Sequence, residues 1–153
     1  MNKSFQSAFL ALIVPLVFSF DRLSKWWALN RLTEGESVAL SFFFHLTRVN
    51  NTGAAFGFFK DFRIFLIVTS VVCVVVLTLM FWRRRTLHAP IDTASLFIVA
   101  GALGNLYDRL RYGYVVDFLD FRVWPVFNLA DASITFGVGL VMLQILRKQS
   151  LGR

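Results

Sequence analysis

Residues 64–82 have the sequence IFLIVTSVVCVVVLTLMFW, an apolar run without a charged residue that ends directly at Arg83-Arg84-Arg85. An α-helix needs about 20 predominantly apolar residues to cross the hydrocarbon core of a bilayer. Clustered basic residues beside such a run are typical of a loop on the cytoplasmic side. The sequence therefore predicts an integral membrane protein with a transmembrane helix at 62–82.

The overall composition agrees with this prediction. The chain has 153 residues, of which 57% are hydrophobic and 16% are charged. A soluble domain of this size does not bury so much apolar surface, whereas a bilayer solvates it. The length predicts one domain, 1–153. The lone cysteine, Cys73, lies among valines, which argues against disulfides and thiolate metal sites.

The formal net charge of +7 brings nucleic-acid binding into consideration. The basic residues, however, lie at the ends of apolar runs and do not alternate with aromatic residues along a groove. At such positions Lys and Arg contact membrane lipids and determine the topology. The charge pattern therefore favours membrane lipids as partners and argues against nucleic acid.

Three further runs predict helices at 5–28, 92–110 and 127–146. We interpret the first as a retained helix, because Asp21-Arg22 interrupts the position where the cleavage site of a leader peptide is expected. Each of the three runs is marginal for a crossing unless neighbouring polar residues also lie in the membrane. Ionisable residues at that depth usually mark a function or a paired structural contact.

The distribution of basic residues predicts that both termini are cytoplasmic, since Lys3, 83–85, Arg147 and Lys148 then share one side. Under this topology the end of helix 1, the start of helix 2, the end of helix 3 and the start of helix 4 all lie at the outer face. The unusual polar residues of the chain gather there: Asp21, Lys25, Asn51, Asn105, Asp108, Arg109, Asn128 and Asp131. This grouping predicts a site at the outer face of the membrane.

The outer segment, residues 30–61, is long for a connector. Apolar residues occur at every second position from Val38 to Leu46, which is the period of a strand with one apolar face. Asn50-Asn51-Thr52-Gly53 then predicts a turn. The expected fold class is an all-α membrane protein with four transmembrane helices and a small extracytoplasmic β-rich segment between helices 1 and 2.

Asp117 and Asp131 are the candidate catalytic residues. Two carboxylates close together do not both ionise easily, so the pair shares one proton at the working pH. One carboxylate can then draw a proton from water while its protonated partner donates to a substrate carbonyl. The corresponding reaction is peptide hydrolysis without a covalent intermediate.

Structural roles are the alternative for both acids. Asn128-x-x-Asp131 at a helix start fits a capping arrangement, in which the helix dipole stabilises Asp131. Asp117 can be a loop acid beside Asp120, solvated or paired with Arg122. The two roles of Asp131 are compatible, because a helix start favours the ionised partner of such a pair.

The third predicted helix supplies supporting residues. Gly101, Asn105 and Asp108 share one face, where the glycine allows close approach of a neighbouring helix. Arg109 can reach a carboxylate or a substrate carbonyl. The alternative is that these side chains only provide hydrogen bonds between helices.

The remaining ionisable residues have a structural interpretation. Asp21 and Lys25 form a favourable i, i+4 pair that relieves the cost of burying both charges. His45 and His88 lie on opposite membrane sides in the predicted topology. A zinc site or a histidine-based triad is therefore not expected.

At this point the sequence resembles bacterial signal peptidase II, the lipoprotein signal peptidase, over almost its whole length. The resemblance rests on five motifs that occur in order together with the predicted crossings. These motifs are Asp21-Arg-Leu-Ser-Lys25, Asn51-Thr-Gly-Ala-Ala-Phe-Gly57, Gly101-Ala-Leu-Gly-Asn-Leu-Tyr-Asp-Arg109, Val115-Val-Asp-Phe118 and Phe127-Asn-Leu-Ala-Asp131.

The resemblance implies an aspartic endopeptidase of the bacterial inner membrane, without metal or cofactor. Such an enzyme cleaves prolipoproteins before a diacylglyceryl-modified cysteine, and the cyclic depsipeptide globomycin inhibits it. Asp117 and Asp131 take the catalytic positions, and Asp21 and Lys25 the structural ones. The positions that line the site and hold substrate or inhibitor are Asn51, Gly101, Asn105, Asp108, Arg109 and Asn128. The compact stretch between Asp117 and Asp131 departs from the family pattern.

Two other functions are weighed against this one. A transporter usually has its site near the bilayer midplane and often contains repeats, whereas here the polar residues gather at one face. A noncatalytic membrane subunit is the second alternative, and it predicts mild effects of Asp→Asn substitutions. Nothing in the sequence requires more than a monomer.

Overall fold

The computed structural model describes residues 3–53, 62–83 and 89–151. Residues 54–61 of the outer segment and 84–88, with His88, lie outside these ranges. The described parts form four helices and three strands. In chain order they are α1 (Lys3–Arg31), β1 (Ser37–Ala39), β2 (His45–Asn51), α2 (Phe62–Arg83), α3 (Ala89–Arg111), β3 (Val115–Asp120) and α4 (Leu129–Leu151).

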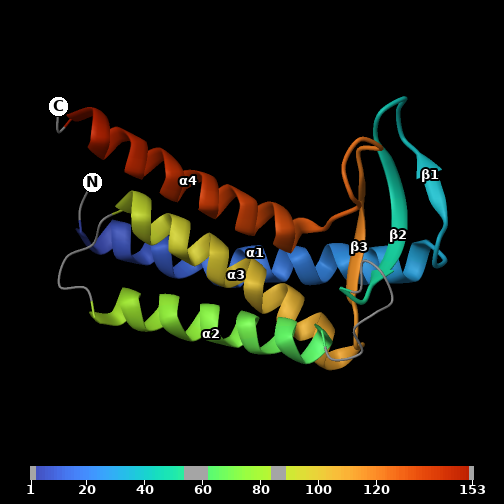
Figure 1. Ribbon diagram of the computed structural model, residues 1–153, viewed down its shortest axis with the longest axis horizontal. Helices are drawn as coiled ribbons and strands as arrows, with labels where there is room; N and C mark the ends of the chain where they lie inside the picture. The colour runs from blue at the N-terminus through green and yellow to red at the C-terminus, as the bar shows by residue number, and fades with distance from the viewer. Residues whose placement is uncertain (1–2, 54–61, 84–88, 152–153) are drawn as a thin grey trace.

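Helix α3 is the centre of the bundle and contacts α1, α2 and α4 (Figure 1). Small residues allow its closest approach to α4. A Cβ atom at Gly101 would clash with the carbonyl oxygen of Ala130, and one at Gly137 would lie 2.6 Å from the carbonyl oxygen of Ala94. Glycine at these positions permits near contact between the two backbones.

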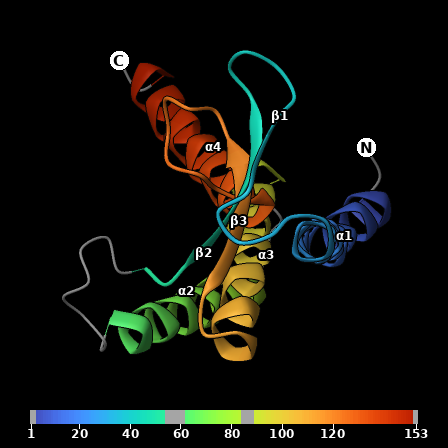
Figure 2. The same ribbon diagram turned by 90° about the vertical axis from the view of Figure 1, so that its right-hand side faces the viewer.

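The strands lie across one end of the bundle, as the view along the helices shows (Figure 2). They form an antiparallel sheet in the order β1-β2-β3. Val38 pairs with Leu46 in the hairpin, and Asn51 pairs with Val115 between β2 and β3. Helix α1 begins, and α4 ends, at the opposite end of the bundle (Figure 1).

A small core attaches the sheet to the bundle. Val116 and Phe118 of β3 pack with Ala28 and Leu32 at the end of α1. Arg48 of β2 adds a hydrogen bond of 2.9 Å from its Nη1 to the carbonyl oxygen of Leu32. The side chain thereby satisfies one of the carbonyl groups that a helix end leaves without a partner.

Two of the described helical segments are long and apolar enough to cross a membrane, Arg63–Arg83 and Leu129–Ser150. The side chains of the first are not buried in the protein. Helices α1 and α3 contain more charged residues, including Asp21, Lys25 and Asp108, and these three are buried. The chain thus presents apolar surface outward and places charges inside, as a membrane requires.

The predicted helices are confirmed with small differences at their ends, and the predicted sheet is present. The strand period from Val38 to Leu46 is interrupted, because residues 40–44 form the turn of a hairpin. The turn predicted at Asn50-Asn51-Thr52-Gly53 begins later than expected, since β2 extends through Asn51 and the Gly53 N–H then donates to Asn51 Oδ1 at 2.8 Å. The left-handed backbone of Gly53, with φ of 76°, follows the strand. Strand β3 was not predicted.

We predict that Gly137→Ala destabilises the protein while Gly139→Ala does not. The new methyl group at 137 would overlap the α3 backbone, and overpacking of this kind costs about 1–3 kcal/mol. A Cβ atom at Gly139 has no atom within 4 Å. Thermal unfolding in detergent measures both variants, and equal midpoints would contradict the close packing of α3 and α4.

Candidate active site

Asp117 lies in the middle of β3 and is 1% exposed. Its neighbours Val116 and Phe118 face α1, so the alternation of the strand directs Asp117 to the other side of the sheet. There Oδ2 accepts a hydrogen bond of 2.9 Å from Asn51 Nδ2, and Oδ1 accepts one of 2.6 Å from Asn128 Nδ2. Amide groups therefore hold both oxygens of the carboxylate.

Asp131 lies in the first turn of α4 and takes part in a reciprocal cap. Its backbone N–H donates to Asn128 Oδ1 at 3.0 Å, and its own Oδ2 accepts from the Asn128 N–H at 3.4 Å. The capping arrangement is confirmed. The side chain also has a second contact, because Asp131 Oδ1 accepts a hydrogen bond of 2.7 Å from Asn105 Nδ2.

Two asparagine amides connect the carboxylates of Asp117 and Asp131. Asn128 Nδ2 donates to Asp117 and also to Asn105 Oδ1, at 3.2 Å. Asn105 in turn donates to Asp131. An amide contains a donor and an acceptor, so each asparagine can link one carboxylate to a further polar group. The residues that the sequence predicts as a pair are thus joined by one hydrogen-bond network.

The environment of Asp117 changes its protonation. Burial is the largest influence and raises the pKa of Asp117 to about 6. The charge of Asp131 also raises this pKa, while the hydrogen bonds from Asn51 and Asn128 and the charge of Lys25 lower it. A carboxyl group in this environment holds a proton at mildly acidic pH.

A buried ion cluster, consisting of Asp21, Arg22, Lys25 and Asp108, lies behind the carboxylate pair. Lys25 Nζ is 3.2 Å from Asp21 Oδ2 and 2.9 Å from Asp108 Oδ2. The same ammonium donates to Asn105 Oδ1 at 2.9 Å. Three acceptors surround the three protons of the ammonium, which therefore fixes the orientation of the Asn105 amide.

Arg22 is the member of this cluster that the sequence prediction missed. Its guanidinium pairs with Asp21 and Asp108, both at 2.5 Å, and lies over the ring of Tyr107 at 4.7 Å. With Arg22 included, the cluster contains two acids and two bases. A second cation directly after Asp21, in a helix expected at membrane depth, is the signal that identifies this role.

The ion cluster also holds the elements that carry the catalytic candidates. Asp21 Oδ1 accepts a hydrogen bond of 3.0 Å from the N–H of Ala130 in α4. Asp108 Oδ2 accepts one of 3.2 Å from the N–H of Val116 in β3. The two contacts fix the residues that directly precede Asp131 and Asp117.

Arg109 is half-buried beside the same carboxyl groups. The charges of Asp131, Asp117 and Asp108 act on its guanidinium, the first most strongly. Asp108 is occupied by its ion pairs with Lys25 and Arg22. The guanidinium of Arg109 therefore lies where its charge acts on the carboxyl groups of Asp131 and Asp117.

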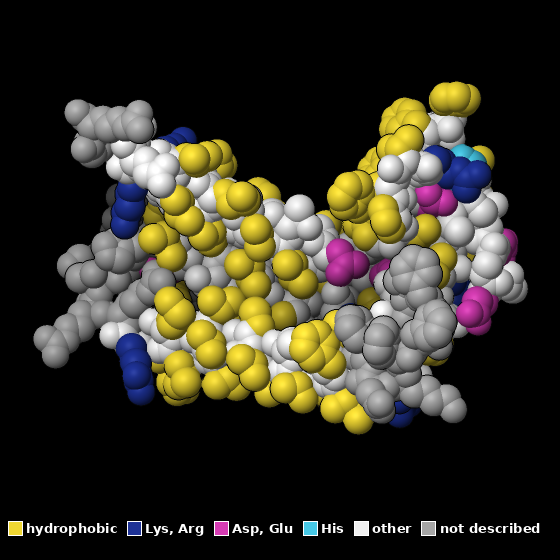
Figure 3. Space-filling model, viewed as in Figure 1, with side chains coloured by type: hydrophobic (Ala, Val, Ile, Leu, Met, Phe, Trp, Pro, Cys, Tyr) yellow, Lys and Arg dark blue, Asp and Glu magenta, His cyan; other side chains and the backbone are white. Residues whose placement is uncertain are grey.

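A cavity of about 470 Å³ opens beside Asp131. Its lining is otherwise mostly apolar and comes from α4 and the loop that precedes it: Phe121, Trp124, Phe127, Asp131, Ala132, Thr135 and Phe136. Figure 3 shows a hollow between α4 and the strands, with hydrophobic side chains on both sides and acidic ones at its base. Of these residues, the sequence analysis predicts only Asp131 as a site residue.

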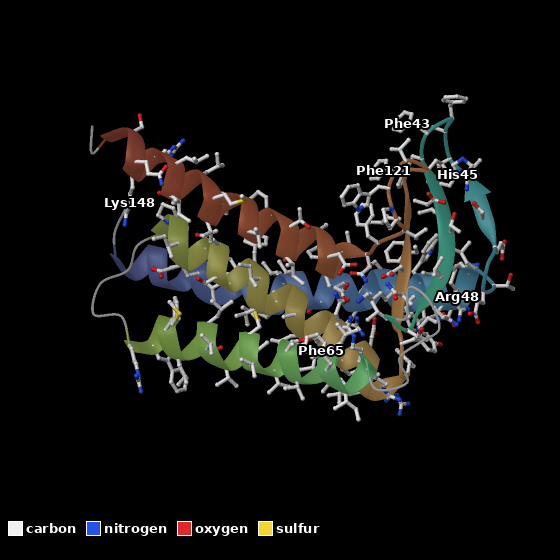
Figure 4. The ribbon with its side chains drawn as sticks, in the orientation of Figure 1. Phe43, His45, Arg48, Phe65, Phe121 and Lys148 are labelled. Carbon is white, nitrogen blue, oxygen red and sulfur yellow. The ribbon has the colours of Figure 1, made fainter. Side chains whose placement is uncertain are left out.

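The predicted site residues thus come together at one end of the bundle. Gly101 provides the close contact between α3 and α4 beside them. His45 and Arg48 lie on the side of the sheet that faces away from α4, and Lys148 lies at the far end of the bundle (Figure 4). The described residues contain no group of three or more His, Cys, Asp or Glu side chains placed to hold a metal ion.

Two carboxyl groups joined by hydrogen bonds beside an apolar cavity, at the end of a bundle of apolar helices, fit the class of membrane enzymes. The fold is similar to a solved structure described as a bacterial membrane enzyme, with a TM-score of 0.86 and 30% identity. This similarity covers 95% of the present chain and 92% of that one. A family model for signal peptidase (SPase) II matches residues 13–147. The chain belongs to the signal peptidase II family.

Curated relatives agree with this assignment. A lipoprotein signal peptidase of Halothermothrix orenii is 39% identical over 142 residues, which are 92% of the chain and 97% of the relative. One of Moorella thermoacetica is 46% identical over 138 residues, which are 88% of the chain and 91% of the relative.

We predict that protonation of Asp117 makes the protein more stable at acidic pH. The pKa of about 6 lies above the ordinary value of 3.8, so the folded state binds the proton more tightly than the unfolded state. The contribution is complete below pH 4 and is lost as the pH rises to about 6, a change of up to about 3 kcal/mol.

Thermal unfolding of wild type and Asp117→Asn between pH 4 and pH 7.5 measures this effect. Relative to the variant, the wild-type midpoint should fall as the pH rises. A constant difference between the two midpoints would exclude the raised pKa.

Proposed function

We propose that the chain is an aspartic endopeptidase that removes signal peptides from prolipoproteins, with Asp117 and Asp131 as its catalytic residues. It cleaves on the N-terminal side of the diacylglyceryl-modified cysteine. The observation that carries this proposal is the network in which Asn51, Asn105 and Asn128 hold both carboxylates beside the apolar cavity. The family assignment and the names of the relatives support the substrate class.

The different environments of the two acids suggest their roles. Asp131, which lines the cavity at the start of α4, is the base that takes a proton from water. Asp117, whose pKa is raised by burial, is the protonated partner that donates to the carbonyl oxygen of the substrate. The attack of water forms a tetrahedral intermediate. A proton then passes to the nitrogen of the cysteine, the C–N bond breaks, and the products are a carboxylic acid and a free amine.

The neighbouring residues have supporting roles in this proposal. Asn51, Asn105 and Asn128 hold the carboxylates, and Arg109 stabilises the developing oxyanion or binds a substrate carbonyl. Gly101 and Asp108 keep α3 in contact with α4 and β3, and Asp21 and Lys25 stabilise the ion cluster. No step of this mechanism requires a metal or cofactor.

For the topology, we propose that all four helices cross the bacterial inner membrane as one domain, with both termini in the cytoplasm. The pairing of the buried charges supports crossing by α1 and α3, because it lowers the cost of placing them at membrane depth. The basic residues at the end of α2 and in the last turn of α4 support the orientation. The site then lies near the outer face.

Access to the site is proposed to be lateral. The hollow beside α4 opens along a helix whose side chains Phe136, Met142 and Leu143 are exposed. Acyl chains can remain in hydrocarbon there while the scissile bond reaches Asp131. Globomycin is expected to bind in the same cavity. The protein is expected to act as a monomer among membrane lipids.

We predict that Asp117→Asn and Asp131→Asn abolish cleavage without unfolding the protein. Loss of one acid–base partner lowers turnover by about 10²–10⁴-fold. Processing of a diacylglyceryl-modified prolipoprotein is the assay, with thermal stability as the measure of folding. Glu34→Gln, at an exposed acid in the turn before β1, is the matched control and should cleave normally. Normal cleavage by both variants would favour a transporter or a noncatalytic subunit.

We also predict that the hairpin covers the substrate, so that Phe42→Asp lowers cleavage more than stability. Phe42 is 100% exposed, and its replacement removes no internal contact. Phe44→Asp should lower both, since the Phe44 ring is 5.0 Å from that of Phe121. Phe42→Trp keeps an apolar ring and is the control. Normal processing by Phe42→Asp would count against a covering role.

A further inference from the structure

The loop between β3 and α4, residues 121–127, forms one wall of the cavity, and we name it the lip. Its base is closed by hydrogen bonds between Leu119 and Phe127, of 3.0 Å and 2.8 Å. The Phe121 ring stacks on Phe127 at 5.8 Å and contacts Phe44 of the hairpin at 5.0 Å. Phe121 lies on the side of the sheet that faces α4 (Figure 4).

The first turn of the lip has an unusual backbone. Arg122 has a φ of 64°, in the left-handed region that residues other than glycine rarely adopt. The conformation directs the Arg122 N–H to Asp120 Oδ1, with a hydrogen bond of 2.7 Å. A backbone hydrogen bond of 2.7 Å from the Val123 N–H to the Phe121 carbonyl oxygen also closes the turn, and the acceptor at position 120 attaches the turn to β3.

Asp120 joins this turn to the neighbouring strand. It is 5% exposed, and its Oδ2 accepts a hydrogen bond of 2.7 Å from Thr47 Oγ1 in β2. Arg122 Nη1 lies 3.4 Å from the same oxygen. The hydrogen bond from Thr47 is the largest influence that holds the pKa of Asp120 below its usual range. The ionised carboxylate is thus a fixed connection between the lip and the sheet.

We propose that Asp120 is a positioning residue for substrate binding, which holds the lip so that Phe121 and Trp124 form the substrate-facing wall of the cavity. The inference rests on the proposed peptidase function. Asp117 keeps its own hydrogen bonds, from Asn51 and Asn128, and these do not involve Asp120. A disturbed lip should therefore weaken binding of the substrate more than it slows the chemical step.

Two pairs of variants test this role. Asp120→Ala removes both side-chain oxygens that accept hydrogen bonds from Arg122 and Thr47. In Asp120→Asn the remaining side-chain oxygen still accepts from the Arg122 N–H. The Thr47 hydroxyl can then donate to Ser37 Oγ, with which it is already in contact. Arg122→Pro lacks the N–H and cannot adopt positive φ. Arg122→Gly keeps the N–H and adopts this φ without strain.

Cleavage of a synthetic diacylglyceryl-modified prolipopeptide gives KM and kcat for each variant. Asp120→Ala and Arg122→Pro should raise KM about 10-fold or more while kcat stays within about 3-fold of wild type, as loss of a charged hydrogen bond predicts. Asp120→Asn and Arg122→Gly should stay near wild-type KM. A KM unchanged in Asp120→Ala, or a loss confined to kcat, would overturn the proposal.

A second measurement reports on the lip without catalysis. In a background with Trp26, Trp27 and Trp82 replaced by Phe, the fluorescence of Trp124 should change in Asp120→Ala and Arg122→Pro but not in the other two variants. Unchanged fluorescence in all four would overturn the positioning role. If the folded wild-type protein does not cleave the prolipopeptide, the proposed function fails, while the fluorescence still decides whether Asp120 holds the lip.

Discussion

The buried ion cluster is the constraint on which the rest of the structure depends. A single charge in a low-dielectric interior is very unfavourable, and removing one member of a buried pair costs about 3–5 kcal/mol. Asp108 comes from α3, whereas Asp21, Arg22 and Lys25 come from α1, so the register in which these two helices pack is the one that pairs all four charges. The same two carboxylates bind the backbones of α4 and β3, so this register also positions the strand and helix of the site.

Asparagine side chains connect the ion cluster to the carboxyl groups of Asp117 and Asp131. The ammonium of Lys25 fixes the Asn105 oxygen, which directs the Asn105 amide nitrogen to Asp131. Asn128 uses its oxygen for the helix start and its nitrogen for Asp117. A carboxylate in place of Asn105 or Asn128 would repel the neighbouring aspartate. An apolar residue there would leave that aspartate without a hydrogen-bond partner. Amides are therefore suited to connect the charged groups of the ion cluster with the carboxyl groups of Asp117 and Asp131.

The sequence predicts those parts of the fold and site that depend on local order. Helix periods, the Asn128–Asp131 cap and the Asp21–Lys25 pair are contained in short segments. Strand β3 was missed because Val115–Asp120 is short and follows a helix directly, so that its strand character depends on pairing with β2. The cavity wall at Phe121 was missed for the same reason, since contacts with distant residues place it there. Asp117 is predicted as one member of a carboxylate pair, but no local pattern distinguishes it from Asp120, and the motif Val115-Val-Asp-Phe118 supports the choice.

The structural and catalytic interpretations of Asp131 are parts of one arrangement. Its capping contacts use the backbone N–H and one oxygen, and leave the other oxygen to Asn105 on the side of the cavity. The two carboxyl groups have different surroundings, because Asp131 begins a helix whereas Asp117 lies buried in the middle of a strand, where burial raises its pKa to about 6. The fold therefore gives two residues of the same type different environments within one hydrogen-bond network, which is the asymmetry that the proposed mechanism uses.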